Sequence, residues 1–125
     1  MDLVVGGAYQ GKLHWAMKEY GIAQEEAFDC ASGISSDQPQ RCLFHMEEFC
    51  WWCIRCGLDP IEEVKKKEPM WRDAVIVCRD IGQGVVPMDH AQRIWREANG
   101  RLVTWLAARA SHVTRVFCGL PQVLK

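Results

Sequence analysis

The chain has 125 residues, of which 49% are apolar and 25% are charged, and its formal net charge is −1. These values are typical of one globular domain with a single core, and they argue against recruitment of nucleic acid or an anionic membrane by a general charge field. The longest early apolar run, Leu3-Val4-Val5, is too short for a signal-peptide core or a transmembrane span. We therefore expect a protein that binds neither nucleic acid nor membrane.

The first elements are predicted to be a strand, a glycine turn and a helix. Residues 3–5 form the short apolar run of a strand that is buried on both faces, and Gly6-Gly7 ends it. A helix is expected over 11–20, with Gly21 as its C-terminal stop. A second short strand is expected over 27–30. The stretch 32–40 is rich in Ser, Gly, Asp and Pro, which predicts a loop.

Helical spacing of apolar residues predicts a helix over 43–56, ended by Gly57. Asp59-Pro60 then supplies an N-cap and a first-turn proline for a second helix, which Pro69 limits. The basic run of residues 65–67 follows two glutamates and is expected to be a solvated face of that helix. The sequence Ala-Val-Ile-Val-Cys at 74–78 is the clearest buried strand.

Asp89 is expected to cap a long helix. The apolar residues that share one face of it are Ala91, Ile94, Trp95, Ala98, Leu102, Trp105, Leu106 and Ala110. Gly100 lies inside this helix at a cost of roughly 1 kcal/mol relative to Ala, which suggests close packing against another backbone. Two strands, 113–118 and 122–124, are predicted to follow, joined by residues 119–121. Alternating strands and helices predict a single α/β domain over 1–125, with a mostly parallel sheet and a C-terminal hairpin.

A glycine-rich motif lies between the first predicted strand and helix. It matches G-x-x-x-x-G-K and comprises Gly6, Gly7, Ala8, Tyr9, Gln10, Gly11, Lys12 and Leu13. In this position successive backbone N–H groups can surround a phosphate, aided by the positive end of the helix, and Lys12 can reach the β- and γ-phosphates. Glycine at positions 6 and 11 permits dihedral angles and close approaches that a Cβ would hinder. An ordinary glycine turn is the alternative interpretation.

Leu13 departs from the usual phosphate-loop pattern. The standard motif has Ser or Thr there, and its hydroxyl is a ligand of the magnesium that accompanies the nucleotide. Leucine has no oxygen, so a water or another carboxylate would have to replace that ligand. This change is compatible with phosphate binding and argues against efficient phosphoryl transfer.

Several short segments share their pattern with one known family. Residues 80–87 (DIGQGVVP) resemble Glu-Val-Gly-x-Gly-Ile-Val-Pro, 96–102 resemble Arg-Asp-x-x-Gly, and 106–110 match Leu-Ala-x-x-Ala. Gly119-Leu120-Pro121 with Lys125 is similar to a closing Gly-Ile-Pro and lysine, and 28–30 (FDC) to a Leu-Asp-Cys strand end. Together with the opening residues 1–20, these segments resemble the adenosylcobinamide kinase/guanylyltransferases of cobalamin synthesis.

The resemblance implies a RecA-like P-loop fold, ATP or GTP as ligand, a corrinoid substrate and a homotrimer. The family's kinase activity phosphorylates the aminopropanol hydroxyl of adenosylcobinamide, and its transferase activity attaches GMP. Residues 6–13 would hold the phosphates, Lys12 and Asp80 would be catalytic, and Asp29 and Asp80 would hold Mg²⁺. Asp29 is expected after an inner strand, and Asp80 at a strand mouth, where ligands bind in open α/β sheets. A carboxylate that caps a turn is the alternative for Asp80.

The chain also departs from the family. The family's guanylylated histidine has a His-x-x-x-Arg-Pro context, and only residues 21–27 stand where that segment would lie. The four histidines, none of them in such a context, are His14, His45, His90 and His112. Tyr9-Gln10 replaces Arg-Ser, and Val103-Thr104 replaces Asn-Gln. We expect guanylyl transfer to be lost, which leaves two hypotheses: a nucleotide-dependent kinase, or a non-catalytic regulatory or assembly subunit.

The cysteines support a third hypothesis. Seven cysteines in a chain without an export signal favour free thiols in a reducing compartment, the cytoplasm by expectation. Cys50, Cys53 and Cys56 form C-x-x-C-x-x-C, a spacing that also occurs in iron–sulfur ligand runs. On a helix, however, the outer two thiols diverge, and cysteine is among the most buried residue types. A cysteine-based metal or redox protein is thus the rival to a nucleotide-binding protein.

Overall fold

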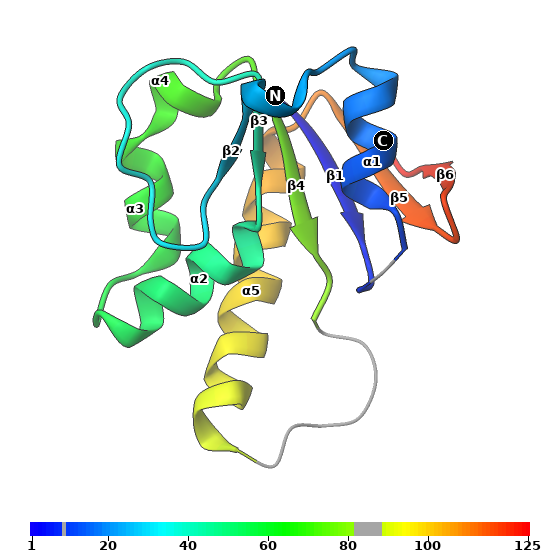
Figure 1. The fold of residues 1–125 in the computed structure, drawn as a ribbon. Helices are drawn as coiled ribbons and strands as arrows, with labels where there is room; N and C mark the ends of the chain where they lie inside the picture. Colours follow the sequence, from blue (N-terminus) through cyan, green and yellow to red (C-terminus); the bar gives the residue numbers. More distant parts are fainter. Residues whose placement is uncertain (9, 82–88) are drawn as a thin grey trace.

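The computed structural model describes residues 1–8, 10–81 and 89–125. Within these residues one sheet has the strand order β2-β3-β4-β1-β5-β6 (Figure 1). Its strands are β1 (Asp2–Gly6), β2 (Ala27–Asp29), β3 (Cys42–Phe44), β4 (Val75–Arg79), β5 (His112–Phe117) and β6 (Leu120–Val123). All neighbours are parallel except β5 and β6, which form an antiparallel hairpin. The predicted α/β class, the mostly parallel sheet and the C-terminal hairpin are confirmed.

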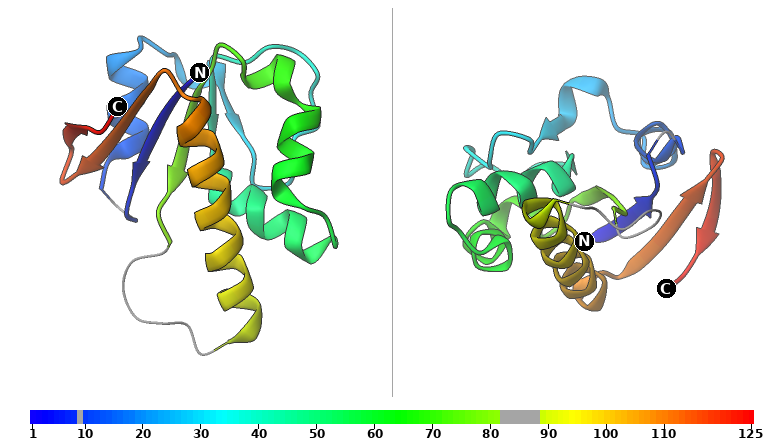
Figure 2. Two further views of the ribbon diagram at one scale, coloured as in Figure 1. Left: turned by 180° about the vertical axis from the view of Figure 1, so that it is seen from behind. Right: turned by 90° about the horizontal axis from the view of Figure 1, so that it is seen from below.

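Helices cover both faces of this sheet. They are α1 (Lys12–Glu19), α2 (Met46–Arg55), α3 (Pro60–Lys66), α4 (Glu68–Trp71) and α5 (His90–Arg109), with a 3₁₀ turn at Gln24–Glu26. Helix α1 packs on one face, whereas α2, α3 and α5 lie on the other (Figure 2). Among the described residues, no helix has the combined length and apolarity needed to cross a membrane.

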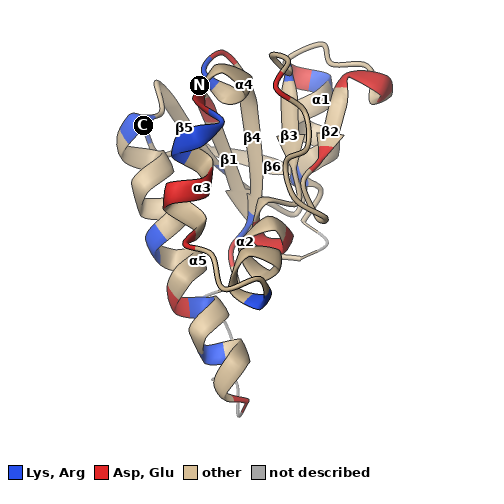
Figure 3. Cartoon of the chain, turned by 90° about the vertical axis from the view of Figure 1, so that its left-hand side faces the viewer, with Lys and Arg blue, Asp and Glu red and all other residues tan. Residues whose placement is uncertain are grey.

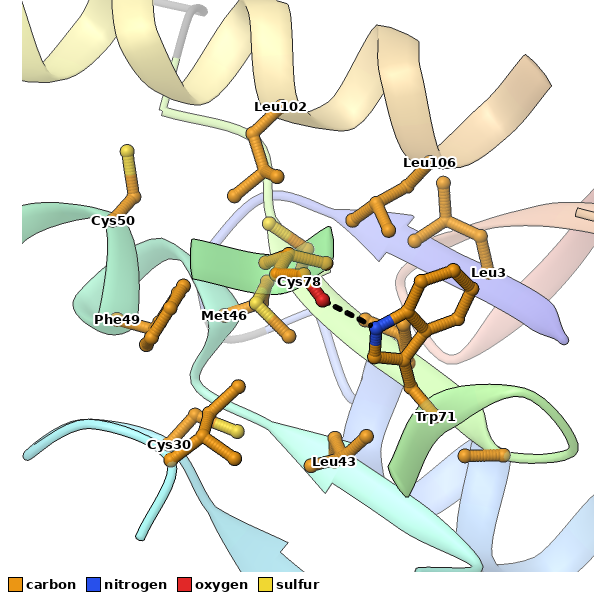
Figure 4. Packing of buried hydrophobic residues seen from close by; sticks show 14 of the residues in the cluster. Leu3, Cys30, Leu43, Met46, Phe49, Cys50, Trp71, Cys78, Leu102 and Leu106 are labelled. Carbon is orange, nitrogen blue, oxygen red and sulfur yellow. Dashed lines mark hydrogen bonds between the residues drawn. The ribbon is translucent and has the colours of Figure 1, made fainter. Parts of the chain in front are cut away.

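The alternation of side chains along the central strands produces two hydrophobic clusters. On β1, Leu3 belongs to the larger cluster beneath α2 and α5, while Val4 belongs to the smaller one beneath α1. Figure 4 shows the larger cluster, in which Leu102 and Leu106 of α5 face the sheet. The Trp71 indole N–H donates to the Val64 carbonyl at 2.8 Å, so this large ring is buried without an unsatisfied donor.

The prediction of one helix over 43–56 was wrong at its beginning. Residues 42–44 form β3 between β2 and β4, His45 has a left-handed backbone (φ 58°), and the helix begins at Met46. A short apolar run satisfies both helical and strand patterns, so periodicity alone cannot separate them. This added strand separates β2, which lies at the edge of the sheet, from β4.

The chain's turns differ from the predictions in two further places. Pro69 limits α3 as expected, but it also lies in the first turn of α4, a helix that the sequence did not reveal. The hairpin turn consists of Cys118 and Gly119, both with positive φ, so Leu120 and Pro121 belong to β6 and not to the turn. Two positive φ values are typical of a two-residue hairpin turn.

Helix α5 corrects two predictions about its faces. No atom of the described residues outside α5's own backbone lies within 4 Å of the position that a Cβ on Gly100 would occupy, so the expected close backbone packing was wrong. The predicted apolar face is buried at Ala98, Leu102, Leu106 and Ala110 and partly buried at Trp95 and Trp105, but Ile94 and Ala91 are exposed. The first turn of α5 extends past the end of the sheet (Figure 1).

The basic run on α3 is a solvated face, as predicted. Lys65 and Lys66 are exposed and pair with Glu62 and Glu63, three residues earlier, at 3.0 and 2.9 Å. Charged residues of both signs lie along the outer side of α3 and α5 (Figure 3). Exposed pairs of this kind contribute little free energy of unfolding.

Candidate functional site

The glycine-rich segment connects the carboxyl end of β1 to the first turn of α1, as predicted. Gly11 is the N-cap of α1 and has φ 78°, a left-handed conformation that favours glycine. A Cβ on Gly6 would lie 2.6 Å from the Val116 carbonyl oxygen on neighbouring β5, so only glycine fits there. Steric constraints therefore explain why glycine occupies two of the predicted positions, 6 and 11. Tyr9 lies outside the described residues.

The β5–β6 turn contacts this loop from the side. The Gly119 N–H donates to the backbone carbonyl of Gln10 at 2.9 Å, and the Cys118 N–H donates to the Gln10 side-chain Oε1 at 2.7 Å. Gly11 is close to the same turn, because a Cβ built on it would lie 3.7 Å from the Gly119 Cα. The loop is thus joined to an element more than one hundred residues away in the sequence.

Lys12 is the first residue of α1, directly after the glycine-rich loop. Its Nζ donates to the Gly7 carbonyl at 3.4 Å, so the side chain folds back across the loop that precedes it. Burial lowers the pKa of the Lys12 ammonium group, and the nearby Glu47 carboxylate partly opposes this effect. A half-buried cation at the start of a helix is suited to hold an anion.

A cavity of about 360 Å³ opens beside the loop, a size within the range of small-ligand sites. Its lining combines loop backbone with side chains from the end of β4 and from α5: Gly7, Ala8, Arg79, Asp80, Ile81, Gln92, Trp95 and Arg96. The Asp80 N–H donates to the Gly6 carbonyl at 2.8 Å, which extends the β1–β4 pairing up to the cavity. The fold therefore brings Asp80 together with the predicted phosphate loop.

Glu47, in the first turn of α2, is a site residue that the sequence analysis missed. Its side chain is only 4% exposed. Oε1 accepts the Arg79 N–H at 2.8 Å, and Oε2 accepts the Glu48 N–H at 3.2 Å. Buried carboxylates need such partners, and this one also stabilises the charge on Lys12. The signal that could have revealed it is its position three residues after a strand. The predicted helix over 43–56 concealed that strand.

The backbone around Glu47 is fixed by two α5 side chains. The Trp95 indole N–H donates to the Glu47 carbonyl at 2.8 Å, and the Asn99 amide donates to the Arg79 carbonyl at 3.1 Å. The Arg79 guanidinium also lies 5.7 Å from the centre of the Trp95 ring. These contacts hold the end of β4 in one position relative to α2 and α5. They therefore also position Asp80, the residue that follows β4.

Asp29 lies apart from the other predicted site residues. It ends β2, the edge strand, with β3 and β4 between it and β1, so the expectation of an inner strand was wrong. Three strand spacings put β2 about 14 Å from β1. Its Oδ1 accepts the Ala31 N–H at 2.9 Å and lies 3.0 Å from Nδ1 of His45. These local contacts stabilise the loop after β2.

Leu13 and the cysteine motif each contribute to packing. Leu13 packs against the apolar cluster under α1 and supplies no oxygen to the site. Cys50 and Cys53 are buried, which raises the pKa of each thiol to about 12, whereas Cys56 is exposed at the end of α2. All seven thiols are free, and no group of three His, Cys, Asp or Glu among the described residues could hold a metal ion. The geometry gives the metal or redox hypothesis no support.

Comparison with known proteins gave one family. The model for "Cobinamide kinase / cobinamide phosphate guanyltransferase" matches residues 58–124, slightly more than half of the chain. This range begins just before α3 and runs past β6, so it contains Asp80 and the hairpin turn but not the glycine-rich segment 6–13. It also contains the DIGQGVVP segment, of which residues 82–87 lie outside the described residues. No curated protein matched the chain.

Proposed function

Because the chain belongs to the cobinamide kinase / cobinamide phosphate guanyltransferase family, we propose that it binds the phosphates of ATP or GTP in a RecA-like P-loop. The observation that carries this proposal is the position of Lys12, which is half-buried at the start of α1 and donates from Nζ to the carbonyl of Gly7, a residue that lines the cavity of about 360 Å³. Residues 6–13 are the proposed phosphate-binding segment. Lys12 would contact the phosphates directly, and Gly6 and Gly11 would allow the backbone to approach them.

The proposed magnesium ligands are fewer than in a standard P-loop. Asp80 lines the cavity and is the carboxylate that we assign to the metal, whereas Leu13 offers no ligand and both Glu47 oxygens accept backbone N–H groups. Magnesium at nucleotide sites needs only one or two protein carboxylates besides the phosphates and water, so the donor set fits a weakly held ion. When bound, it would neutralise phosphate charge.

Titration calorimetry with ATP and GTP, each with Mg²⁺ and with a chelator, tests the nucleotide proposal. We expect saturable binding of at least one nucleotide under both conditions. No binding of either nucleotide at millimolar concentration would contradict it.

Two alternatives remain for the activity of this site. Leu13 favours a non-catalytic regulatory or assembly subunit, while the family membership favours kinase activity on adenosylcobinamide; guanylyl transfer is proposed to be lost. Incubation with adenosylcobinamide and GTP or ATP, followed by mass spectrometry, separates the two, because a phosphorylated product establishes the kinase. A homotrimer in the cytoplasm is part of the proposal, and sedimentation equilibrium measures the oligomer directly.

Replacing Leu13 with serine should make nucleotide binding depend on magnesium. The serine hydroxyl supplies the missing ligand, so Mg²⁺ should improve the affinity of Leu13→Ser for ATP by about tenfold more than that of the wild type. Calorimetry with and without Mg²⁺ measures the ratio. Met17→Ser is the control, since Met17 packs against the same cluster in α1 but lies away from the loop. An equal effect of Mg²⁺ on both variants would exclude Leu13 as the cause.

The pKa of Lys12 predicts how nucleotide binding depends on pH. The protonated ammonium binds phosphate, and its pKa is lowered from 10.5, so affinity should fall as the pH rises through this lowered pKa. In Glu47→Gln the fall should begin at a lower pH, because a neutral amide no longer stabilises the ammonium. Dissociation constants for ATP between about pH 7 and pH 10 measure this shift.

The control for this experiment is the neighbouring residue. Glu48 is exposed, so Glu48→Gln should keep the wild-type pH profile. The amide oxygen of Glu47→Gln can still accept the Arg79 N–H, which keeps the local backbone in place. If Glu47→Gln and the wild type had the same profile, Glu47 would not act on Lys12.

A further inference from the structure

The β5–β6 turn has a conformation that its own sequence does not favour. Cys118 has φ 51°, a left-handed backbone that residues with a Cβ rarely adopt, and Gly119 follows with φ 75°. The turn and its flanking residues Phe117 and Leu120 are exposed, so no apolar packing holds this conformation. The turn is therefore ordered by the strand pairing of Phe117 with Leu120 and by its contacts with the phosphate loop.

Gln10 supplies those contacts with both its backbone and its side chain. Its carbonyl accepts the Gly119 N–H at 2.9 Å, and its Oε1 accepts the Cys118 N–H at 2.7 Å. In a trans peptide the carbonyl of residue 10 and the N–H of residue 11 point in opposite directions. Holding the Gln10 carbonyl against the turn thus fixes the direction of the Gly11 N–H, one of the amides of the proposed phosphate site.

Two of the positions at which this loop differs from the resembled family, Gln10 and Leu13, have complementary consequences. Leu13 removes a hydroxyl that would connect the loop to a nucleotide-bound metal. Gln10, where the resembled family has Ser, adds a side chain long enough to reach the turn. In this chain the Gln10 side chain holds the phosphate loop against the turn by accepting the Cys118 N–H. A serine at position 10 would be too short to provide this acceptor.

We propose that Gln10 is a positioning residue, which keeps the phosphate loop in its anion-binding shape by joining it to the β5–β6 turn. This inference rests on the proposed function for the identity of the anion. In this proposal the hairpin affects nucleotide affinity through Gln10, although the hairpin does not line the described cavity.

Two measurements on Gln10→Met test the proposal. Methionine has similar length but lacks the amide oxygen, so hydrogen exchange without ligand should become faster in peptides covering 6–13 and 117–120. Affinity for ATP should fall by about three- to tenfold, the range expected for one net hydrogen bond. Gln10→Glu keeps an oxygen acceptor and should retain slow exchange in both peptides. Gln10→Ser, with a side chain too short to reach the turn, should behave like Gln10→Met.

The matched control is Gln122→Met, on the exposed side of the same hairpin, which should change neither exchange in 6–13 nor affinity. Unchanged exchange of 6–13 in both Gln10→Met and Gln10→Ser would overturn the proposal. So would unchanged ATP affinity in these variants when the wild type binds ATP. If the wild type binds no nucleotide, the proposed function fails, and hydrogen exchange alone still decides whether Gln10 orders the loop.

Discussion

Replacing Lys12 with methionine is expected to weaken ATP and GTP binding by roughly 100-fold, the upper range for one charge-assisted hydrogen bond to a phosphate. Lys12 is the cation that the fold places in the loop, with its Nζ 3.4 Å from the Gly7 carbonyl. Methionine keeps most of the side-chain length and removes only the charge and the donors. Titration calorimetry at neutral pH measures both dissociation constants.

Lys18→Met is the matched control for this change. Lys18 lies on the same helix but is exposed in its last turn, so the variant loses the same charge at a distance from the loop. Its affinity should remain within about twofold of the wild type, because exposed charges are screened by salt. An equal loss of affinity in Lys12→Met and Lys18→Met would show that net charge, and not the loop, determines nucleotide binding.

Replacing Gly6 with alanine is expected to lower the free energy of unfolding by about 3 kcal/mol, at the upper end of overpacking effects. The added Cβ would lie 2.6 Å from the Val116 carbonyl oxygen, and a backbone atom within the sheet cannot move aside cheaply. Two adjacent strands, β1 and β5, would have to separate. A decrease of about 10 °C in the melting temperature, measured by circular dichroism, is the expected result.

Gly100→Ala is the same substitution at another position, and it is expected to raise the melting temperature and not to lower it. Its Cβ would meet nothing within 4 Å, and it lies inside α5 without a left-handed backbone. Alanine favours the helix by roughly 1 kcal/mol over glycine, so the melting temperature should rise by a few degrees. Destabilisation by Gly100→Ala as large as that by Gly6→Ala would show that the contact with Val116 is not the cause.

The sequence predicted the elements whose patterns are long or sharply bounded. Asp59 and Asp89 were identified as N-caps, and each carboxylate accepts the backbone N–H groups of the following turn. The run at 74–78 corresponds to β4, shifted by one residue, because a continuous apolar segment fits a strand with helices on both faces. Local signals sufficed here, since capping and burial on both faces leave direct marks in the sequence.

Short segments were harder to predict. Residues 42–44 form a strand of three residues whose Cys and Leu also fit the helical pattern that follows. That error had consequences for the site, because it hid the strand that precedes Glu47. Asp29 was assigned to Mg²⁺ by the family resemblance, which placed it after an inner strand, whereas β2 is an edge strand and two strands separate it from β1.

By itself, the sequence determined the α/β class, the order of most helices and strands, the position of the glycine-rich loop and the family to which the chain belongs. Only the tertiary structure decided which carboxylates lie beside Lys12, since strand order depends on pairing between segments far apart in the chain. It also revealed the contact of Gln10 with Cys118, 108 positions away. Periodicity and spacing describe neighbours along the chain, whereas a binding site consists of neighbours in space.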